Sequence, residues 1–283
     1  MISFDPRLTP ARPDLAAAHL ADKVPAPRYV AGRAMHLAIG LTDLRHVPSP
    51  EARIDSQVLY GENLMLYEAH EGWGWVQLGG DHYVGYLPLA ALAEGETKAT
   101  HKVTANRTFI YPRPDIKAPI LAALPLGAAV TLTGPDGYFG RLANGGFVIA
   151  VHLMRIDERA EDFVAVAEGL IGAPYLWGGK SCLGLDCSGL VQIALAQAGV
   201  EAPRDTDLQQ QALGSPLPLD AVANHLKRGD LIFWKGHVGI MRDHEILLHA
   251  NAHHMLVASE PLAQARARIR DKGAGEIIAI KRL

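Results

Sequence analysis

Cysteine is scarce in this sequence. Only Cys182 and Cys187 occur in 283 residues, so a disulfide framework does not hold the chain together. An excess of one charge is also missing, because 27 basic and 30 acidic side chains leave a formal charge of −3. Proteins that bind nucleic acid or an anionic membrane surface usually show a basic excess. We therefore expect neither nucleic acid nor membrane as a partner.

Long hydrophobic runs are absent as well. The strongest run, residues 147–151, has the length of a strand, whereas a membrane-spanning helix needs roughly 18 apolar residues. Charged side chains such as Asp5, Arg7 and Asp14 interrupt the first 30 residues, which therefore lack the apolar stretch of a secretory signal. We expect the protein in the cytoplasm, and export without a signal is the alternative.

The composition is that of a globular protein, with 49% hydrophobic and 20% charged residues. Length alone predicts about two domains of roughly 150 residues each. Changes in sequence pattern divide the chain further. We predict a proline-rich N-terminal extension (1–32), two small β domains (33–95 and 96–156) and a C-terminal domain (157–283).

The two predicted β domains share one pattern. Short apolar stretches alternate with glycine-containing turns, which is typical of small all-β barrels. In LYGENLMLYEAHEGWGWVQL and in LPLGAAVTLTGPDGYFGRLANGGFVIA, a glycine precedes a strand and an acidic-Gly turn precedes an aromatic strand. This pattern suggests a degenerate duplication, and both segments resemble bacterial SH3-type (SH3b) domains.

The C-terminal domain begins with helical patterns and ends with strands. Apolar spacing predicts a helix near residues 160–170, a second helix after Asp186 and a short helix over 208–213. The later pattern predicts five strands, at 230–234, 237–241, 245–250, 255–258 and 276–281. Helices followed by a sheet indicate an α+β fold.

Cys187 is the sharpest chemical feature. It lies in LDCSGLVQIALAQAG, at the N-terminal end of a predicted amphipathic helix. Unpaired N–H groups and the positive end of the helix dipole stabilise a thiolate there, so the pattern predicts a lowered thiol pKa and a nucleophile. The alternative is an ordinary small buried side chain. Cys182 lies in a glycine-rich loop and is predicted to be structural.

Two histidines are candidates for the proton transfers. HVGIM and EILLHA are joined by a short connection with turn residues, so they are expected to form an antiparallel hairpin. With the turn centred near residue 243, His237 and His249 face each other across the strands. Such a pair suits a base, His237, and the residue that orients it, His249. The alternative is that one or both are ordinary strand histidines.

A cluster of histidines raises a metal-binding alternative; its members are His244, His249, His253 and His254. No HxxxH pattern on a helix and no paired CxxC motif accompanies them, and their spacing falls in a predicted hairpin and loop. We therefore predict no metal site and no cofactor.

Three segments together carry a family resemblance: PYLWGGKSCLGLDCSGLVQIALAQAGV, PRDTDLQ and RGDLIFWKGHVGIMRDHEILLHAN. They closely resemble the NlpC-type family of papain-like cell-wall cysteine peptidases from Glu158 to the C-terminus. The resemblance implies an α+β papain-like core with Cys187 as nucleophile, His237 as general base and acid, and His249 as third polar residue. Tyr175 matches the family tyrosine near the nucleophile.

A narrower resemblance rests on the two SH3b-like segments and the PRDTD loop. The chain is similar to γ-D-glutamyl-L-diamino-acid endopeptidases that recycle murein peptides. This resemblance implies that Asp186 and Ser188 help to bind the free N-terminal amine of the substrate. It also implies that Glu62 and Tyr83 of the first barrel close the S2 side. The alternatives are a solvated turn residue for Glu62 and a barrel-core aromatic for Tyr83.

The sequence therefore predicts a cysteine endopeptidase. We expect it to hydrolyse the amide between γ-D-glutamate and a diamino acid in murein peptides that carry a free N-terminal L-alanine. The alternatives are a peptidoglycan amidase or acyltransferase of the same fold, and a wall-binding module without catalysis.

Overall fold

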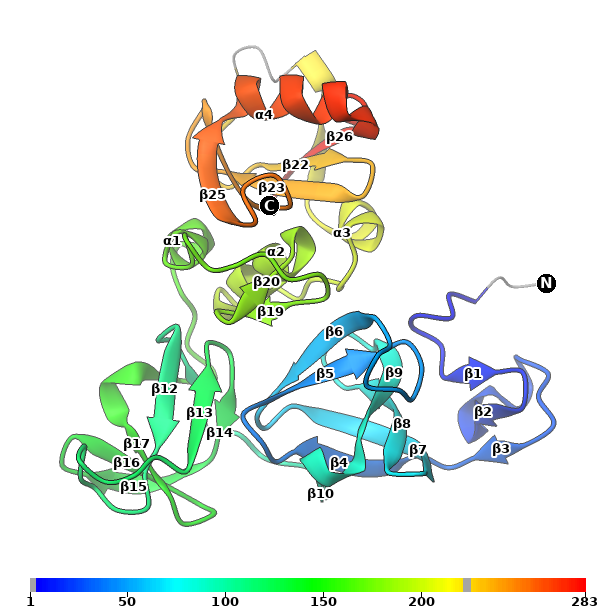
Figure 1. Ribbon diagram of the computed structural model, residues 1–283, viewed down its shortest axis with the longest axis vertical. Helices are drawn as coiled ribbons and strands as arrows, with labels where there is room; N and C mark the ends of the chain where they lie inside the picture. Colours follow the sequence, from blue (N-terminus) through cyan, green and yellow to red (C-terminus); the bar gives the residue numbers. More distant parts are fainter. Residues whose placement is uncertain (1–3, 221–224) are drawn as a thin grey trace. The chain divides into compact units, whose positions relative to one another are not determined.

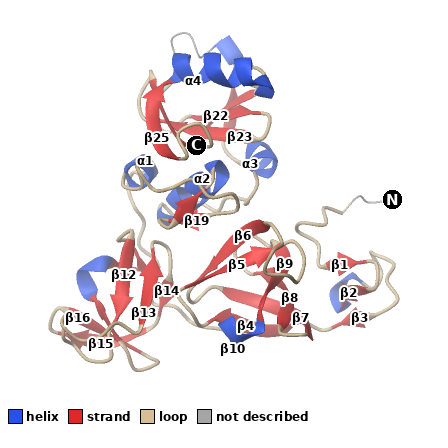
Figure 2. Cartoon of the chain, viewed as in Figure 1, coloured by secondary structure: helices blue, strands red, loops and turns tan. Residues whose placement is uncertain are grey.

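A computed structural model describes residues 4–220 and 225–283 of the chain. The chain divides into two compact units, Met1–Asp157 and Glu158–Leu283. Within the described ranges, the first unit contains strands and short 3-10 turns, whereas the second contains four α-helices as well as strands (Figures 1 and 2). Among the described residues, no helix has the length and apolar character needed to cross a membrane.

Residues 11–30, within the predicted N-terminal extension, form a small sheet. Strand β1 (Ala11–Arg12) pairs antiparallel with β2 (Leu15–Ala17), and β2 pairs parallel with β3 (Tyr29–Val30). The frequent prolines limit helix here to one 3-10 turn, Ala18–Leu20.

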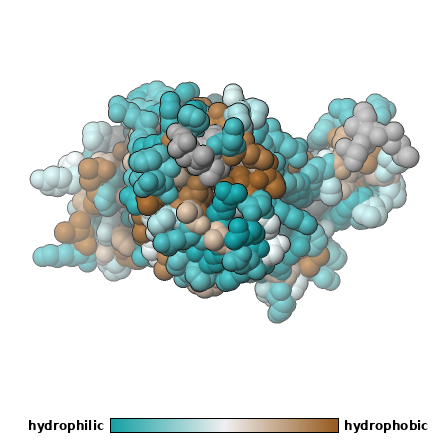
Figure 3. All heavy atoms as spheres, turned by 90° about the horizontal axis from the view of Figure 1, so that it is seen from above, coloured by the Kyte–Doolittle hydropathy of each residue, from teal (hydrophilic) through white to brown (hydrophobic). Residues whose placement is uncertain are grey.

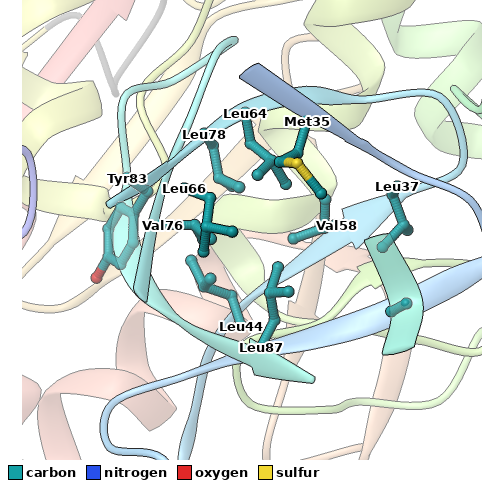
Figure 4. Close-up of a cluster of buried hydrophobic side chains, with 11 residues drawn as sticks. Met35, Leu37, Leu44, Val58, Leu64, Leu66, Val76, Leu78, Tyr83 and Leu87 are labelled. Atoms are coloured by element: carbon teal, nitrogen blue, oxygen red, sulfur yellow. The ribbon is translucent and has the colours of Figure 1, made fainter. Parts of the chain in front are cut away.

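A seven-stranded antiparallel sheet follows, in the order β10-β4-β7-β8-β9-β5-β6. Its inward-facing residues enclose one aliphatic core that includes Leu44, Val58 and Val76, with Tyr83 at one edge (Figure 4). Its strands are β4 (Arg33–Leu37), β5 (Leu41–Arg45), β6 (Ile54–Leu59), β7 (Asn63–His70), β8 (Trp73–Leu78), β9 (Val84–Pro88) and β10 (Leu92–Glu94).

The remainder of the first unit consists of three smaller antiparallel sheets, with orders β14-β11-β18, β12-β13 and β15-β16-β17. Val103, Leu124 and Val148 contribute to their main apolar core. The strands are β11 (His101–Val103), β12 (Arg107–Ile110), β13 (Ala122–Pro125), β14 (Ala129–Val130), β15 (Leu132–Asp136), β16 (Phe139–Leu142), β17 (Phe147–Ile149) and β18 (Leu153–Arg155).

The second unit is built on a six-stranded sheet in the order β21-β26-β22-β23-β24-β25. Its strands are β21 (Ser215–Leu217), β22 (Leu231–Trp234), β23 (His237–Met241), β24 (Ile246–Asn251), β25 (Leu256–Pro261) and β26 (Ala279–Arg282). A separate two-stranded sheet pairs β19 (Lys180–Ser181) with β20 (Gly184–Leu185). The five strands predicted for this unit all occur, with ends shifted by a few residues, whereas β19, β20 and β21 were not predicted.

Helices cover both sides of the six-stranded sheet. α1 (Phe163–Glu168), α2 (Cys187–Gln197) and α3 (Thr206–Ala212) lie on one side, and α4 (Leu262–Ile269) lies on the other (Figure 1). Leu262 and Ala265 of α4 pack into a core with Trp234 and Leu247 of the sheet. Hydrophilic side chains cover much of the surface seen from the α4 side (Figure 3). Helix α4 was not predicted, although its apolar residues have helical spacing.

Candidate active site

Cys187 is the first residue of α2, and its position is built by the residues around it. Asp186 is the N-cap of this helix, and its carboxylate accepts a hydrogen bond of 2.7 Å from Gly189 N–H. A Cβ at position 189 would lie 2.1 Å from the carbonyl oxygen of Gly179, so only glycine fits there. At the other end, Gly199 has a φ of +74° and ends the helix. The predicted start and stop of this helix are therefore present.

The Cys187 side chain is 8% exposed and has polar neighbours from two other elements. Its Sγ lies 3.8 Å from Thr206 Oγ1 at the start of α3. The backbone of Val238, next to His237, also acts on this thiol and lowers its pKa. Helix α2 packs against β23, the strand that begins at His237.

The thiol pKa differs from the sequence-based prediction. Burial, and next the Asp186 carboxylate, raise the pKa of Cys187 to about 11, although the Val238 and Thr206 hydrogen bonds act in the opposite direction. The prediction of a lowered pKa was wrong because the sequence does not reveal how completely the thiol is withdrawn from water. The resting side chain is therefore a thiol rather than a thiolate near neutral pH.

Asp186 forms a buried ion pair with Arg204. Its two carboxylate oxygens accept hydrogen bonds of 2.9 and 2.6 Å from the guanidinium, and a third of 2.8 Å from Gly178 N–H. Arg204 also donates to Ser188 Oγ at 2.9 Å and is only 1% exposed. Asp186 and Ser188 thus lie together beside the nucleophile, and their binding of a substrate amine stays a prediction. Arg204 was missed as a site residue, although it lies in the PRDTD motif.

The two predicted histidines are in contact. His237 Nε2 lies 2.8 Å from His249 Nδ1, and the ring of Trp234 packs beside His237 with a centroid separation of 5.7 Å. His249 is 1% exposed. A half-buried His237 at the start of β23 and a buried His249 on β24 therefore form a hydrogen-bonded pair.

The predicted register of the hairpin was wrong by two residues, because the turn is centred near residue 244 and not near residue 243. Ile240 pairs with Leu248, so the ladder places Gly239, and not His237, opposite His249. The cause is the turn, where the Asp243 carboxylate accepts from the N–H groups of Glu245 and Ile246. His237 and His249 remain on one face as diagonal neighbours, and Gly239 has no side chain to separate their rings.

A carboxylate that was not predicted, Glu260, extends the hydrogen-bonded pair. The side chains of His237, His249 and Glu260 thus form a row in which each contacts the next. His249 Nε2 lies 2.8 Å from Glu260 Oε1 on β25. Arg268 of α4 donates to both oxygens of Glu260, at 2.6 Å for Oε2. The signal was the helical spacing of Leu262, Ala265 and Ile269, which predicts a helix that carries Arg268 back toward the strand.

Burial and charge set the pKa values of this row. Burial and the neighbouring His249 lower the pKa of His237 to about 3, and burial lowers the pKa of His249. Hydrogen bonds from His249 and Arg268 outweigh burial and lower the pKa of Glu260 to about 2. Both histidines are therefore neutral and Glu260 is ionised near neutral pH.

Tyr175 lies close to the nucleophile. Burial, with smaller contributions from the charges of Cys187 and Asp186, raises its pKa to about 12. Its backbone is held by a bridge to Leu185 and by a hydrogen bond of 2.9 Å from its N–H to the Met255 carbonyl. The phenol therefore stays protonated and can donate a hydrogen bond beside Cys187.

Glu62 and Tyr83 lie in the first unit. Glu62 accepts a hydrogen bond of 2.8 Å from Leu59 N–H, and Tyr83 is 5% exposed in the core of the seven-stranded sheet (Figure 4). Both contacts have a local structural function. Their contribution to the S2 side stays a prediction.

One group of side chains has donor atoms close enough together to bind a metal ion. In the described part of the chain, donor atoms of His249, His254 and Glu260 lie within 4.8 Å of one another. Arg268 already binds both oxygens of Glu260, and a guanidinium repels a cation at that position. The group is better explained as a hydrogen-bonded ion pair.

Comparisons with known proteins show which domains and which fold the chain resembles. Residues 172–268 match the model of the NlpC/P60 family, and residues 44–92 match that of the bacterial dipeptidyl-peptidase SH3 domain. A solved NlpC/P60 family protein from Bacillus cereus ATCC 10987 superposes with a TM-score of 0.73 at 19% identity, over 88% of this chain and 99% of that one. This likeness confirms the predicted fold class, a papain-like core preceded by SH3-like sheets.

Two curated relatives are similar in sequence. Dipeptidyl-peptidase 6 of Lysinibacillus sphaericus is 30% identical over 178 residues, which are 62% of each chain, so the match spans less than two thirds of that relative. The gamma-D-glutamyl-L-lysine dipeptidyl-peptidase of Bacillus subtilis (strain 168) is 28% identical over 72% of this chain and 71% of its own length. Residues 172–268 are thus similar to NlpC/P60 domains, and a segment similar to a bacterial SH3 domain lies ahead of them in the sequence.

Proposed function

We propose that this protein is a cysteine endopeptidase that hydrolyses the γ-D-glutamyl–diamino acid bond of murein peptides with a free N-terminal L-alanine. The observation that carries the proposal is the placement of Cys187 at the start of α2, against the strand that bears His237 and its partner His249. The names of the Lysinibacillus and Bacillus relatives, a dipeptidyl-peptidase and a γ-D-glutamyl-L-lysine dipeptidyl-peptidase, support the substrate class.

The proposed reaction begins with a neutral thiol. His237 takes the proton of Cys187 as the sulfur attacks the amide carbonyl carbon, and N–H groups at the first turn of α2 stabilise the resulting oxyanion. The protonated His237 then gives its proton to the leaving amine, and the free diamino acid departs. Water, deprotonated by His237, hydrolyses the thioester and releases the L-Ala-γ-D-Glu dipeptide.

Substrate selection is proposed to act at the amine end. A free L-alanyl amine is positively charged, and a carboxylate beside the nucleophile attracts it. We assign this role to Asp186 with Ser188, and we assign to Tyr175 a hydrogen bond to the substrate. Because Arg204 forms an ion pair with Asp186, the Asp186 carboxylate attracts the substrate amine less strongly than a carboxylate without that ion pair would. Glu62 and Tyr83 are proposed to close the S2 side.

This selection implies a role in recycling. Stem peptides of intact cell wall have the L-alanyl amine acylated and lack the positive charge that the proposed site requires. The substrates would then be fragments already released from the wall, and the reaction would belong to murein peptide recycling.

Product analysis tests the proposal. The full chain is incubated with L-Ala-γ-D-Glu-L-Lys, with the corresponding diaminopimelate tripeptide and with the N-acetylated form of each. Mass spectrometry should detect L-Ala-γ-D-Glu and the free diamino acid. Acetylation should reduce kcat/KM by about tenfold or more, as expected for loss of a charge-assisted hydrogen bond. Cleavage between alanine and glutamate, amide release from a muramyl peptide, or acyl transfer without hydrolysis would refute it.

A further inference from the structure

We propose that Glu260, held by Arg268, is a positioning residue that fixes the tautomers of His249 and His237, so that Nδ1 of His237 is the basic nitrogen. This inference rests on the proposed function, in which His237 is the general base. It concerns two residues outside the segments that carry the family resemblance of the nucleophile.

Glu260 determines which nitrogen of His249 carries the proton. Arg268 donates to both of its oxygens, and the ion pair is mostly shielded from water, with side-chain exposures of 9% for Glu260 and 18% for Arg268. An ionised carboxylate can only accept hydrogen bonds. The 2.8 Å contact between His249 Nε2 and Glu260 Oε1 therefore requires the proton to be on His249 Nε2.

The position of the proton on His249 in turn determines its position on His237. A neutral His249 with its proton on Nε2 has a lone pair on Nδ1. The 2.8 Å contact with His237 Nε2 is then a hydrogen bond in which His237 donates. A neutral His237 that carries its proton on Nε2 has an unprotonated Nδ1, which is the nitrogen left to accept the thiol proton of Cys187.

Loss of the Glu260 carboxylate would permit a second tautomer of both histidines. Without Glu260, His249 can carry its proton on Nδ1 and donate to His237 Nε2. His237 then carries its own proton on Nδ1 and cannot take one from Cys187. Glu260 excludes this inactive tautomer, much as a carboxylate orients the histidine of a catalytic triad. It also stabilises the positive charge that His237 acquires during the attack.

Several charged and titratable groups face this row. Arg268 approaches from α4, and His254, from the loop between β24 and β25, places Nδ1 3.9 Å from Glu260 Oε1. On the nucleophile side lie Asp186 and Arg204. Glu260 raises the pKa of His237, whereas Arg268 lowers it. Removing each partner alone therefore shifts the pKa of His237 in opposite directions.

The variants are Glu260→Gln and Arg268→Gln in the full chain. For E260Q we expect kcat to fall by about 100-fold, the usual scale of general-base catalysis, with little change in KM and an acidic limb of the pH profile at lower pH. For R268Q we expect a smaller loss of kcat and an acidic limb at higher pH. Arg270→Gln is the matched control, because Arg270 is exposed and pairs with Asp271 and Glu276 instead.

A readout without substrate separates this inference from the proposed function. In protein labelled with ¹⁵N-histidine, side-chain shifts assigned with His237→Ala and His249→Ala should show protonation at Nε2 of both residues in the wild type. In E260Q, the Nδ1-protonated form should appear, whether or not the murein tripeptide is the substrate. Protonation of wild-type His249 at Nδ1 overturns the inference, as does an E260Q enzyme with wild-type kcat and acidic limb. If E260Q does not fold, the wild-type spectrum and the R268Q profile decide.

Discussion

Two carboxylate–arginine pairs flank the active site, and they act differently. Asp186 directs its oxygens to the backbone of the nucleophile helix and to Arg204, and its charge raises the pKa of the Cys187 thiol. Glu260 accepts from His249 as well as from Arg268, and its charge raises the pKa of His237. The same ion pair chemistry thus builds the nucleophile's position on one side and tunes the base on the other.

This difference locates the activation step. A buried thiol beside a carboxylate does not ionise readily, so a preformed thiolate does not supply the reactivity. The proton has to move to His237 as the bond to carbon forms. The row that ends at Glu260 makes this movement possible, because it keeps Nδ1 of His237 unprotonated.

The largest stability effect is expected at the first pair. Asp186→Ala removes the N-cap of α2 and the carboxylate that forms the ion pair with Arg204, whose exposure is 1%. The free energy of unfolding should fall by about 3–5 kcal/mol, as found when one partner of a buried pair is removed. Denaturant unfolding of the full chain measures it. A loss below about 1 kcal/mol, the scale of a surface pair, would contradict the structural role given to Asp186.

An intermediate effect is expected on thiol reactivity. Alkylation of unliganded Cys187 by iodoacetamide should be slow at pH 7 and should rise as pH approaches the thiol pKa of about 11. Asp186→Asn removes a charge that raises this pKa, so the rise should begin at lower pH. Peptide mapping distinguishes Cys187 from Cys182. Fast alkylation of the wild type that is independent of pH between 5 and 8 would show a preformed thiolate. It would contradict the claim that Cys187 is a neutral thiol beside the Asp186 carboxylate.

The smallest effect is expected at an exposed pair that serves as a control. The Arg228 guanidinium lies 2.7 Å from an Asp162 carboxylate oxygen and 2.9 Å from a Glu168 carboxylate oxygen. Arg228→Ala should lower the free energy of unfolding by about 1 kcal/mol or less, without changing hydrolysis.

The pH dependence of that control has a definite sign. Arg228 and Arg242 lower the pKa of Glu168 from 4.5 to about 2. The ionised Glu168 carboxylate stabilises the folded protein above the ordinary glutamate pKa of 4.5. This stabilisation is lost as pH falls through the pKa of about 2 that Glu168 has in the folded protein. The stability difference between wild type and R228A should therefore narrow from pH 4.5 downward, and a difference that grows with acidity would contradict the assignment.

Much of the site could be predicted from local sequence. Cys187 follows the helix cap Asp186, and the strand patterns place His237 and His249 on adjacent strands. The carboxylate behind them could not be found this way, because Glu260 reaches His249 only through strand pairing and Arg268 only through a helix on the far side of the sheet. The thiol pKa was wrong for a related reason, since burial depends on the tertiary fold.

The register of the hairpin shows the same limit, since the predicted pairing was wrong by two residues. The hairpin of β23 and β24 was predicted from alternation and turn residues, and both strands occur. The side chain of Asp243 accepts two backbone hydrogen bonds and lengthens the turn, which moves the pairing. In the first unit, the sequence pattern predicted two similar β domains. It did not predict that strands β4 to β10 form one seven-stranded sheet whereas strands β11 to β18 form three small sheets.

The central claim is that Cys187 is the nucleophile, and the other cysteine provides the most direct test. Cys187→Ala and Cys182→Ala are compared with the wild type on L-Ala-γ-D-Glu-L-Lys, with folding checked by circular dichroism. The account predicts that C182A releases lysine at the wild-type rate and that C187A releases none above background. Release of lysine by folded C187A at the wild-type rate would contradict it.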